Sequence, residues 1–188
     1  KNNVKVHFGA EVFAVVKKEN QFNVTITDGQ KFDADSILLA TGFQQFDARR
    51  KEEYGYGIYN NVITSADLEE MFRSKKGIKT PTGKVPGKVG IIHCVGSRDV
   101  KCGNGYCSSV CCITAVKQAI EIKELVPEAE VFCFYMDLRM FGRYFEDIYK
   151  KAQEKFGVQF VRGRLSEAVE NTDETVMLKV EDTLAGRP

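Results

Sequence analysis

The sequence lacks the features that would point to several common classes of protein. It has 27 basic and 26 acidic residues, a net charge of +1, so the strong basic excess of a nucleic-acid-binding surface is missing. Its apolar runs, such as Val89–Ile92, fall far short of the roughly 20 residues that a membrane span needs. The first residues are polar and show no signal peptide. No HExxH motif, Ser–His–Asp set or carboxylate pair stands out, which leaves hydrolase chemistry with little support.

The composition instead indicates a globular chain with a local concentration of thiols. Hydrophobic residues make up 43% of the 188 residues, enough for one domain or two incomplete ones. There are six cysteines, and five of them lie between Cys94 and Cys112. A small secreted disulfide scaffold would spread its cysteines along the chain, whereas this cluster indicates a metal or redox site in a reducing compartment. We therefore expect a cytoplasmic location.

The beginning of the chain predicts a small antiparallel meander followed by one buried strand. Asp28-Gly29 is a strong hairpin turn signal between two alternating segments. The run Asp35–Gly42 is apolar and ends in small residues, as expected of a strand buried in a parallel sheet with a ligand near its carboxyl end. The expected strands of the meander are Val4–Phe8, Glu11–Lys17, Phe22–Thr27 and Lys31–Ala34.

The rest of the chain predicts an α/β fold, a Rossmann-like parallel sheet with flanking helices, because strand and helix patterns alternate along it. Ser65 is expected to cap a helix over residues 66–74, and Pro81–Gly87 is expected to be a linker. The expected strands are Lys88–His93, Glu130–Met136 and Val158–Val161, the expected helices are Ser109–Leu125 and Tyr144–Phe156, and a final hairpin pairs Leu165–Val169 with Thr175–Val180.

These patterns predict three parts. Residues 1–45 would be a partial dinucleotide-domain segment, residues 46–87 a connecting segment, and residues 88–188 an α/β domain that carries the cysteines. The chain begins without Met in a strand-like segment and ends on a turn. We therefore expect an internal piece of a longer protein.

Four cysteines are expected to converge. Cys94 follows the first strand of the α/β domain, at the carboxyl end where such sheets bind ligands. Cys107 and Cys111 are four residues apart and would lie on one face of a helix, with Cys112 beside them. A helix N-terminus favours thiolates and anionic clusters.

The residues alone leave the chemistry of this group open. Four thiolates suit a [4Fe–4S] cluster or zinc. The spacing Cys-x12-Cys-x3-Cys-Cys matches neither paired zinc knuckles nor the ferredoxin run, so zinc, a redox-active disulfide and plain buried thiols stay beside the favoured iron–sulfur cluster. Cys102 has no assigned role, and Cys133 is expected in the core. For His93 we favour a buried, hydrogen-bonded ring over a ligand.

Several motifs together resemble the family of heterodisulfide reductase A subunits, which includes the flavoprotein of the quinone-interacting membrane-bound oxidoreductase. The specific combination is Cys-Val-Gly-Ser-Arg-Asp at 94–99 with Tyr-Cys-Ser-x-x-Cys-Cys at 106–112. Ala-Thr-Gly-Phe at 40–43 and Tyr-Met-Asp-Leu-Arg at 135–139 fit as well. The resemblance runs over essentially the whole chain.

The resemblance implies a fold like that of thioredoxin reductase, with an inserted NAD(P)-type domain at 88–188 and part of an FAD-binding domain at 1–45. It implies a [4Fe–4S] cluster on Cys94, Cys107, Cys111 and Cys112. It also implies FAD near Val12, Ala40, Thr41 and Gly42. Such a protein is an oxidoreductase subunit of anaerobes that passes electrons between FAD, [4Fe–4S] clusters and the other subunits of an electron-transfer complex.

Two other functions stay open beside this one. A non-catalytic docking domain could be stapled by a metal or a disulfide. A plain pyridine nucleotide–disulfide oxidoreductase would need a Gly-rich loop after Ile92, and the segment Val95–Arg98 holds a single glycine. The chain also lacks the FAD pyrophosphate loop and ferredoxin-like segments, so we expect this piece alone to be inactive and able to lose both cofactors.

Overall fold

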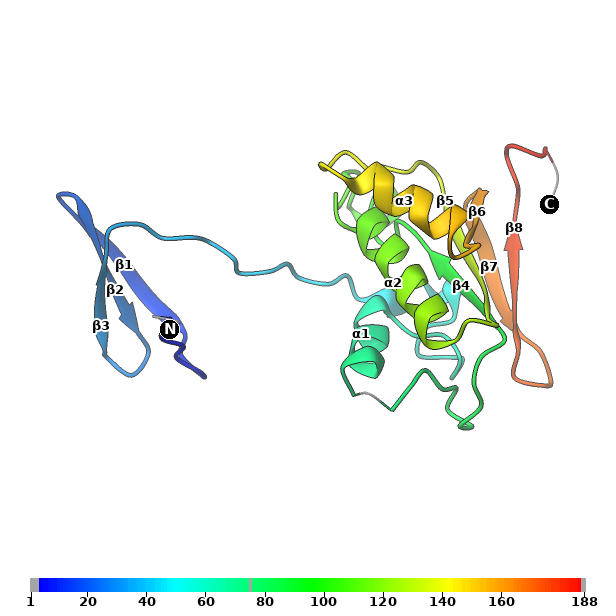
Figure 1. Cartoon of the computed structure of the whole chain (residues 1–188), viewed down its shortest axis with the longest axis horizontal. Coiled ribbons are helices and arrows are strands. Elements are labelled where there is room, and N and C mark those ends of the chain that lie inside the picture. Colours follow the sequence, from blue (N-terminus) through cyan, green and yellow to red (C-terminus); the bar gives the residue numbers. More distant parts are fainter. Residues whose placement is uncertain (1–3, 75, 187–188) are drawn as a thin grey trace. The chain divides into compact units, whose positions relative to one another are not determined.

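The computed structural model describes residues 4–74 and 76–186, and the chain divides into two compact units between Gln44 and Gln45. The first unit is an antiparallel meander of β1 (Val12–Lys18), β2 (Gln21–Ile26) and β3 (Lys31–Ala34), in that order (Figure 1). The predicted turn joins β2 to β3, with the Gln30 amide donating to the Asp28 carboxylate at 2.8 Å. These three predicted strands are confirmed, whereas Val4–Phe8 forms no strand.

The predicted buried strand at Asp35–Gly42 is wrong. This segment has no regular structure, and Leu38 and Leu39 are 92% and 81% exposed. A strand of a parallel sheet depends on neighbours that satisfy its backbone N–H and C=O groups. No strand among the described residues pairs with this segment, and its apolar pattern alone does not hold it in a sheet.

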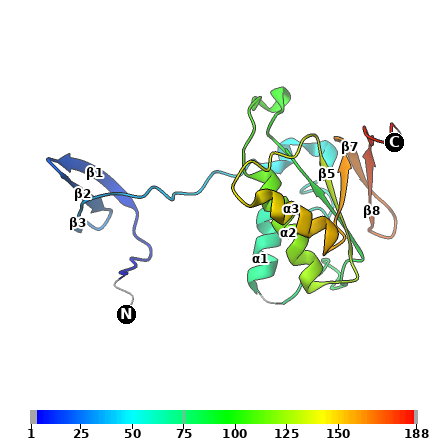
Figure 2. The same ribbon diagram turned by 45° about the horizontal axis from the view of Figure 1, so that its top comes forward.

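The second unit contains the predicted parallel sheet. Its strands are β4 (Lys88–Ile92), β5 (Glu130–Tyr135) and β6 (Gln159–Arg162), paired in that order. The connections run through α2 (Cys111–Leu125) and α3 (Phe145–Glu154). Because the strand order runs in one direction, crossovers of one hand place both helices on the same face of the sheet, as Figure 2 shows. The Rossmann-like α/β fold class is confirmed.

The core lies between this sheet and its helices. Val116, Ala119 and Ile122 of α2 and Val131 and Cys133 of β5 are fully buried. Their burial follows from the helical spacing in α2 and from the β-forming residues of β5. The expectation that Cys133 belongs to the core is confirmed.

The remaining elements in the described part of the second unit are one hairpin and four short helices. The hairpin of β7 (Leu165–Glu170) and β8 (Val176–Val180) lies against the face opposite the helices, where a Cβ on Gly90 of β4 would collide with Leu178. The other elements are α1 (Ser65–Ser74), η1 (Ala48–Arg50), η2 (Glu52–Tyr54) and η3 (Val100–Cys102).

The N-cap of α1 differs from the prediction by one residue. The Thr64 hydroxyl accepts from the Asp67 amide, while the Asp67 carboxylate accepts from the Thr64 amide at 2.8 Å. This reciprocal pair is a capping box, so the N-cap residue of α1 is Thr64 and not Ser65.

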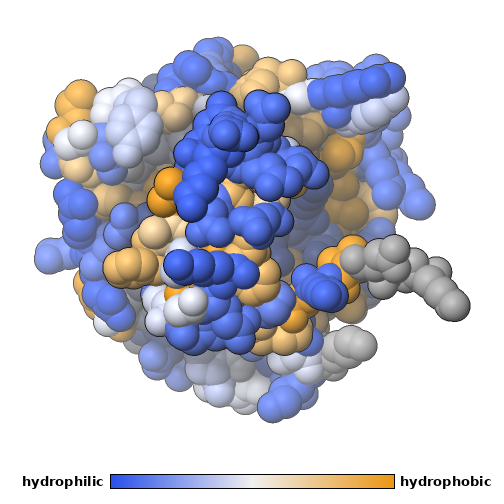
Figure 3. Space-filling view, turned by 90° about the vertical axis from the view of Figure 1, so that its left-hand side faces the viewer, coloured by the Kyte–Doolittle hydropathy of each residue, from blue (hydrophilic) through white to orange (hydrophobic). Residues whose placement is uncertain are grey.

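One face of the surface is mainly polar (Figure 3). Hydrophilic side chains predominate on the face shown in Figure 3, with apolar ones scattered between them. Within residues 4–74 and 76–186, none of the helices has the length and apolar character that crossing a membrane requires.

Candidate metal centre

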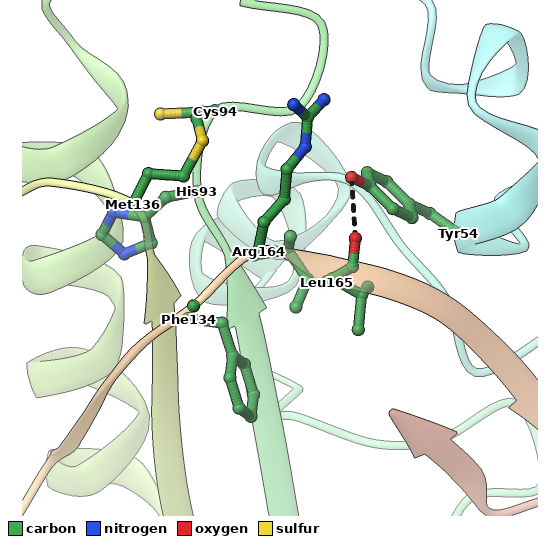
Figure 4. A pocket seen from close by; sticks show the side chains of 9 residues that line it. Tyr54, His93, Cys94, Phe134, Met136, Arg164 and Leu165 are labelled. Carbon is green, nitrogen blue, oxygen red and sulfur yellow. Dashed lines mark hydrogen bonds between the residues drawn. The ribbon is translucent and has the colours of Figure 1, made fainter. Parts of the chain in front are cut away.

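The site lies where the parallel strands of the second unit end. The backbone of His93 continues the pairing of β4, since its N–H donates to the Phe134 carbonyl at 3.0 Å. Cys94 then turns the chain with a left-handed φ of 59° and is buried. Figure 4 shows His93, Cys94 and Met136 on one side of a small pocket at this edge, with Tyr54 on the other side.

Three of the four predicted ligands converge. The Sγ atoms of Cys94 and Cys111 are 4.0 Å apart. The Sγ atoms of Cys111 and Cys112 also belong to a group with His93 whose potential ligand atoms all lie within 4.8 Å of one another. The six cysteines are free thiols. The carboxyl end of β4 and the start of α2 thus bring residues far apart in sequence to one place.

Cys107 does not share a helix with Cys111, contrary to the prediction. The helix begins at Cys111, and Ser109 before it has a φ of 62°, which breaks the helical path. The Cys107 Sγ accepts from the Ser109 amide at 3.3 Å. The pKa of Cys112 is raised mainly by its hydrogen bond to Cys111 and by burial, with a smaller contribution from Cys107. The role of Cys107 as a ligand stays a prediction.

The start of α2 suits a negative charge. Val110 at the N-cap position makes no side-chain capping bond. The N-cap side chain therefore does not satisfy the first backbone N–H groups of the helix, which begins at Cys111. The pKa of Cys111 is held well below its ordinary value by hydrogen bonding with Cys112 and Cys94. The pKa of Cys94 is raised because its thiol hydrogen-bonds Cys111 and is buried. The shifts of Cys94 and Cys111 thus run in opposite directions because the two sulfurs share a hydrogen bond.

A compact loop carries the chain from Cys94 to Cys107. The Arg98 amide donates to the Tyr106 carbonyl at 2.8 Å, and Asp99 forms a β-bridge with Asn104. Cys102 lies at the far end of this loop, outside the converging group, and its carbonyl accepts from Arg50 at 3.0 Å. Gly103 ends the short helix η3 (Val100–Cys102) with a left-handed φ of 78°.

A buried ion cluster anchors this loop, and no sequence pattern predicts it. Asp99 is 3% exposed and its carboxylate accepts from Lys51 at 3.0 Å and from Arg164 at 2.8 Å. The Lys51 hydrogen bond, opposed by burial, lowers the pKa of Asp99. Burial lowers the pKa of Lys51, but hydrogen bonds to Glu53 and Asp99 outweigh it and raise this pKa to about 12.

The guanidinium of Arg98 and the backbone amide of Arg139 act on the thiols. Arg98 forms an ion pair with Asp137 at 2.9 Å and lies within electrostatic reach of Cys94 and Cys107. The backbone N–H of Arg139 donates to the Cys112 Sγ at 3.4 Å. Hydrogen bonds of this kind to a ligand sulfur help to orient it and to stabilise its anion.

His93 is buried, as expected, but its ring is not hydrogen-bonded. Neither Nδ1 nor Nε2 has a partner among the described residues. Burial lowers the pKa of His93, which favours the neutral ring. An uncharged imidazole with a free nitrogen lone pair and a free N–H is suited to a metal site.

The residues predicted to lie near FAD are not gathered into a site. Ala40, Thr41 and Gly42 belong to the exposed segment after β3, and Val12 is an exposed residue at the start of β1. Within residues 4–44, these four residues line no enclosed surface that could hold a flavin. Their role stays a prediction.

The thiol group fits an iron–sulfur cluster chemically. It combines converging soft donors, uncapped helix N–H groups and an adjacent arginine, and all three favour an anionic cluster of iron and sulfide. The orphaned nitrogens of His93 also indicate that a bound group belongs beside them.

Comparison with known proteins identifies the family. The family model of pyridine nucleotide-disulphide oxidoreductases matches residues 1–187. The chain belongs to this oxidoreductase family. The match agrees with the observed Rossmann-like sheet.

Curated relatives narrow the resemblance. The chain is 45% identical over 162 residues, 84% of its length, to the A subunit of the H(2):CoB-CoM heterodisulfide,ferredoxin reductase of Methanothermobacter marburgensis. It is 43% identical over 183 residues, 94% of its length, to the A subunit of the H(2)/formate:CoB-CoM heterodisulfide,ferredoxin reductase of Methanococcus maripaludis. It is 46% identical over 162 residues, 83% of its length, to the iron-sulfur A subunit of the CoB--CoM heterodisulfide reductase of Methanocaldococcus jannaschii. The resemblance found in the motifs is confirmed.

These relatives are much longer than the chain. The matched region spans 25%, 27% and 25% of their respective lengths. The comparison therefore bears on one part of such a protein, namely the α/β unit with its cysteines and the meander before it.

Proposed function

We propose that this chain is part of an electron-transfer oxidoreductase of the same kind as the A subunits of heterodisulfide reductases. In it, Cys94, Cys107, Cys111 and Cys112 hold a [4Fe–4S] cluster. The observation that carries the proposal is the convergence of Cys94, Cys111 and Cys112 at the uncapped start of α2. When bound, such a cluster accepts and donates single electrons.

The chain's own residues would prepare this site. Cys94 and Cys112 are buried, which limits the access of water to their sulfurs. Asp99 holds the loop between Cys94 and Cys107 in place through its contacts with Lys51 and Arg164. Arg98 offsets part of the negative charge of the thiolates and the cluster.

The wider context of the proposal comes from the family. In the whole protein, electrons would pass between FAD, this cluster and further [4Fe–4S] clusters, and then to the other subunits of a complex in the cytoplasm. The FAD would lie near Val12, Ala40, Thr41 and Gly42. Residues 1–45 would belong to the FAD-binding domain, residues 46–87 would connect, and residues 88–188 would form the NAD(P)-type domain.

A cysteine variant tests the cluster. After anaerobic reconstitution, the wild-type chain should carry about four irons and four sulfides. Cys111→Ser removes the sulfur that contacts both Cys94 and the His93–Cys112 pair, and it should lose most of the iron and the visible absorption. Cys102→Ser is the matched control, because Cys102 lies outside the converging group, and it should keep both. Equal iron in the two variants would contradict the ligand assignment.

One observation favours a second candidate, a zinc-stapled docking domain. Two sulfurs on one tetrahedral zinc lie about 3.8 Å apart when each Zn–S bond is about 2.3 Å, and the Cys94 and Cys111 sulfurs are 4.0 Å apart. With His93 and Cys112, the site would then have a Cys3His set. Stoichiometric zinc that iron and sulfide do not displace under anaerobic conditions would support this candidate.

A further inference from the structure

The side chain of His93 has an unfilled hydrogen-bonding capacity in a buried place. The residue is 7% exposed, and neither ring nitrogen has a hydrogen-bond partner within the described part of the chain. Leaving such a group unsatisfied destabilises the folded state, so folded proteins rarely do so without a bound partner.

The ring nitrogen faces sulfur. A nitrogen of His93 lies in one group with the Sγ atoms of Cys111 and Cys112, with all separations within 4.8 Å. The ring of Tyr135 lies to another side, with its centroid 6.4 Å from that of the imidazole. Figure 4 shows His93 beside Cys94. The missing partner of the ring therefore belongs to the space bounded by the thiols.

The four cysteines already give one ligand to each iron of a [4Fe–4S] cluster, so His93 is left without an iron to bind. An imidazole ring carries at least one N–H donor, and neither ring nitrogen of His93 has a partner among the described residues. A donor beside a cluster bonds most readily to a sulfur, either a cysteine Sγ or a bridging sulfide.

We propose that His93 is a positioning residue that donates its ring N–H to a sulfur of the cluster held by Cys94, Cys107, Cys111 and Cys112, and thereby raises the reduction potential of that cluster. This inference rests on the proposed function. Reduction adds negative charge to the cluster, and a hydrogen bond to sulfur stabilises the more negative state. Loss of the donor therefore makes reduction harder.

The test compares His93→Phe, His93→Gln and wild type, using the full chain with its reconstituted cluster. Phenylalanine keeps a flat ring of similar size without a donor, whereas the glutamine amide keeps an N–H. His7→Phe is the matched control, because it makes the same change at the other of the two histidines, in the first unit. Redox titration followed by electron paramagnetic resonance gives each potential, and iron analysis gives each occupancy.

We expect His93→Phe to keep its iron while its equilibrium constant for reduction falls about tenfold, which for one electron is about 59 mV. His93→Gln should fall less, and His7→Phe should match wild type. A His93→Phe potential equal to that of wild type, with full occupancy, would overturn the role of His93 and leave the proposed function standing. Loss of iron from His93→Phe alone would make His93 a ligand and also overturn this role.

A second measurement does not depend on a variant folding. In wild-type protein labelled with 15N-histidine, pulsed electron paramagnetic resonance of the reduced cluster should show a weak nitrogen coupling that persists in His7→Phe. A strong coupling, typical of nitrogen bound to iron, or no coupling at all would contradict the donor role. A wild-type chain that binds no cluster would overturn the proposed function and this inference together.

Discussion

Asp99 joins parts of the second unit that are far apart in sequence. It accepts hydrogen bonds from Lys51 before the α/β sheet and from Arg164 after β6, and it is itself in the loop that carries the cysteines. Charged groups are rarely buried in this way unless they are paired. A single carboxylate thus connects the loop between Cys94 and Cys107 to the segment before the sheet, through Lys51, and to the segment after β6, through Arg164.

The ionisation of the Asp99 carboxylate should be visible in how the free energy of unfolding changes with pH. The pKa of Asp99 lies below its ordinary value of 3.8, so as the pH falls from there the unfolded chain takes up the proton before the folded one. The free energy of unfolding should therefore decrease as the pH falls from 3.8 through the lowered value. Asp99→Asn should be less stable at pH 7 and lose less of its stability over this acid range, as followed by urea unfolding.

Asp33→Asn is the control for this prediction, because Asp33 is an exposed residue of β3 in the other unit. Its acid profile should follow that of wild type. An Asp99→Asn profile parallel to wild type would show that the buried ion cluster does not contribute to acid stability.

At the residue scale, the sequence predicts the cysteines of the site but not the residues that hold the site in place. Cysteine is rare and its clustering is visible in the chain, so the group of Cys94, Cys111 and Cys112 could be predicted. Lys51 and Arg164 are ordinary charged residues in sequence, and only the fold brings them to Asp99. The free ring of His93 is likewise a property of its surroundings, which no local pattern contains.

The loop between β4 and α2 is the element that forms the candidate site. Two of its glycines, Gly96 and Gly103, have left-handed φ angles of 73° and 78°. A Cβ at Gly96 would collide with the ring of Phe46, whereas a Cβ at Gly103 meets nothing within 4 Å. The two positions therefore share a left-handed backbone, which would strain any residue with a Cβ, and differ in packing.

Alanine at these two glycines should separate the two effects. Gly103→Ala should cost roughly 1–2 kcal/mol of stability from the left-handed backbone alone. Gly96→Ala should cost about 1–3 kcal/mol more because Phe46 must move, and it should also weaken cluster retention through Cys94, two residues away. Urea unfolding and iron analysis check both. An equal loss of unfolding free energy in the two variants would mean that the Phe46 ring moves aside without destabilising the fold.

Elements whose stability is local were predicted well, and those that depend on partners were not. β5 and α2 combine strong propensity with their own periodicity, and both were found within a few residues of their bounds. The segment Asp35–Gly42 has an equally clear apolar pattern, but it lacks a pairing strand among the described residues and remains irregular. The start of α2 was placed two residues early because the turn at Ser109 depends on the loop before it.

At the scale of the whole molecule, the two units differ in how much core they have. Among residues 4–44, Ile26 is the one buried hydrophobic residue, whereas the second unit contains the packed core around Val116, Ile122 and Val131. A meander with so little buried surface is marginally stable by itself. The second unit has the sheet, the helices and the thiols needed for the proposed cluster.

Separating the units should show this difference. A variant with residues 45–188 only should keep the helical circular dichroism and the melting temperature of the full chain and should still bind the cluster. A peptide of residues 1–44 should be largely unfolded. A large fall in the melting temperature of 45–188, measured by circular dichroism, would show instead that the meander stabilises the α/β unit.

The central claim is that this α/β unit holds one [4Fe–4S] cluster on four cysteines. Native mass spectrometry of the anaerobically reconstituted chain tests it most directly, because it weighs the bound group on the intact protein. We predict one added mass of four irons and four sulfides per chain, absent from Cys111→Ser. A wild-type chain that carries a single zinc ion, or that stays free of metal with six thiols, would contradict the account.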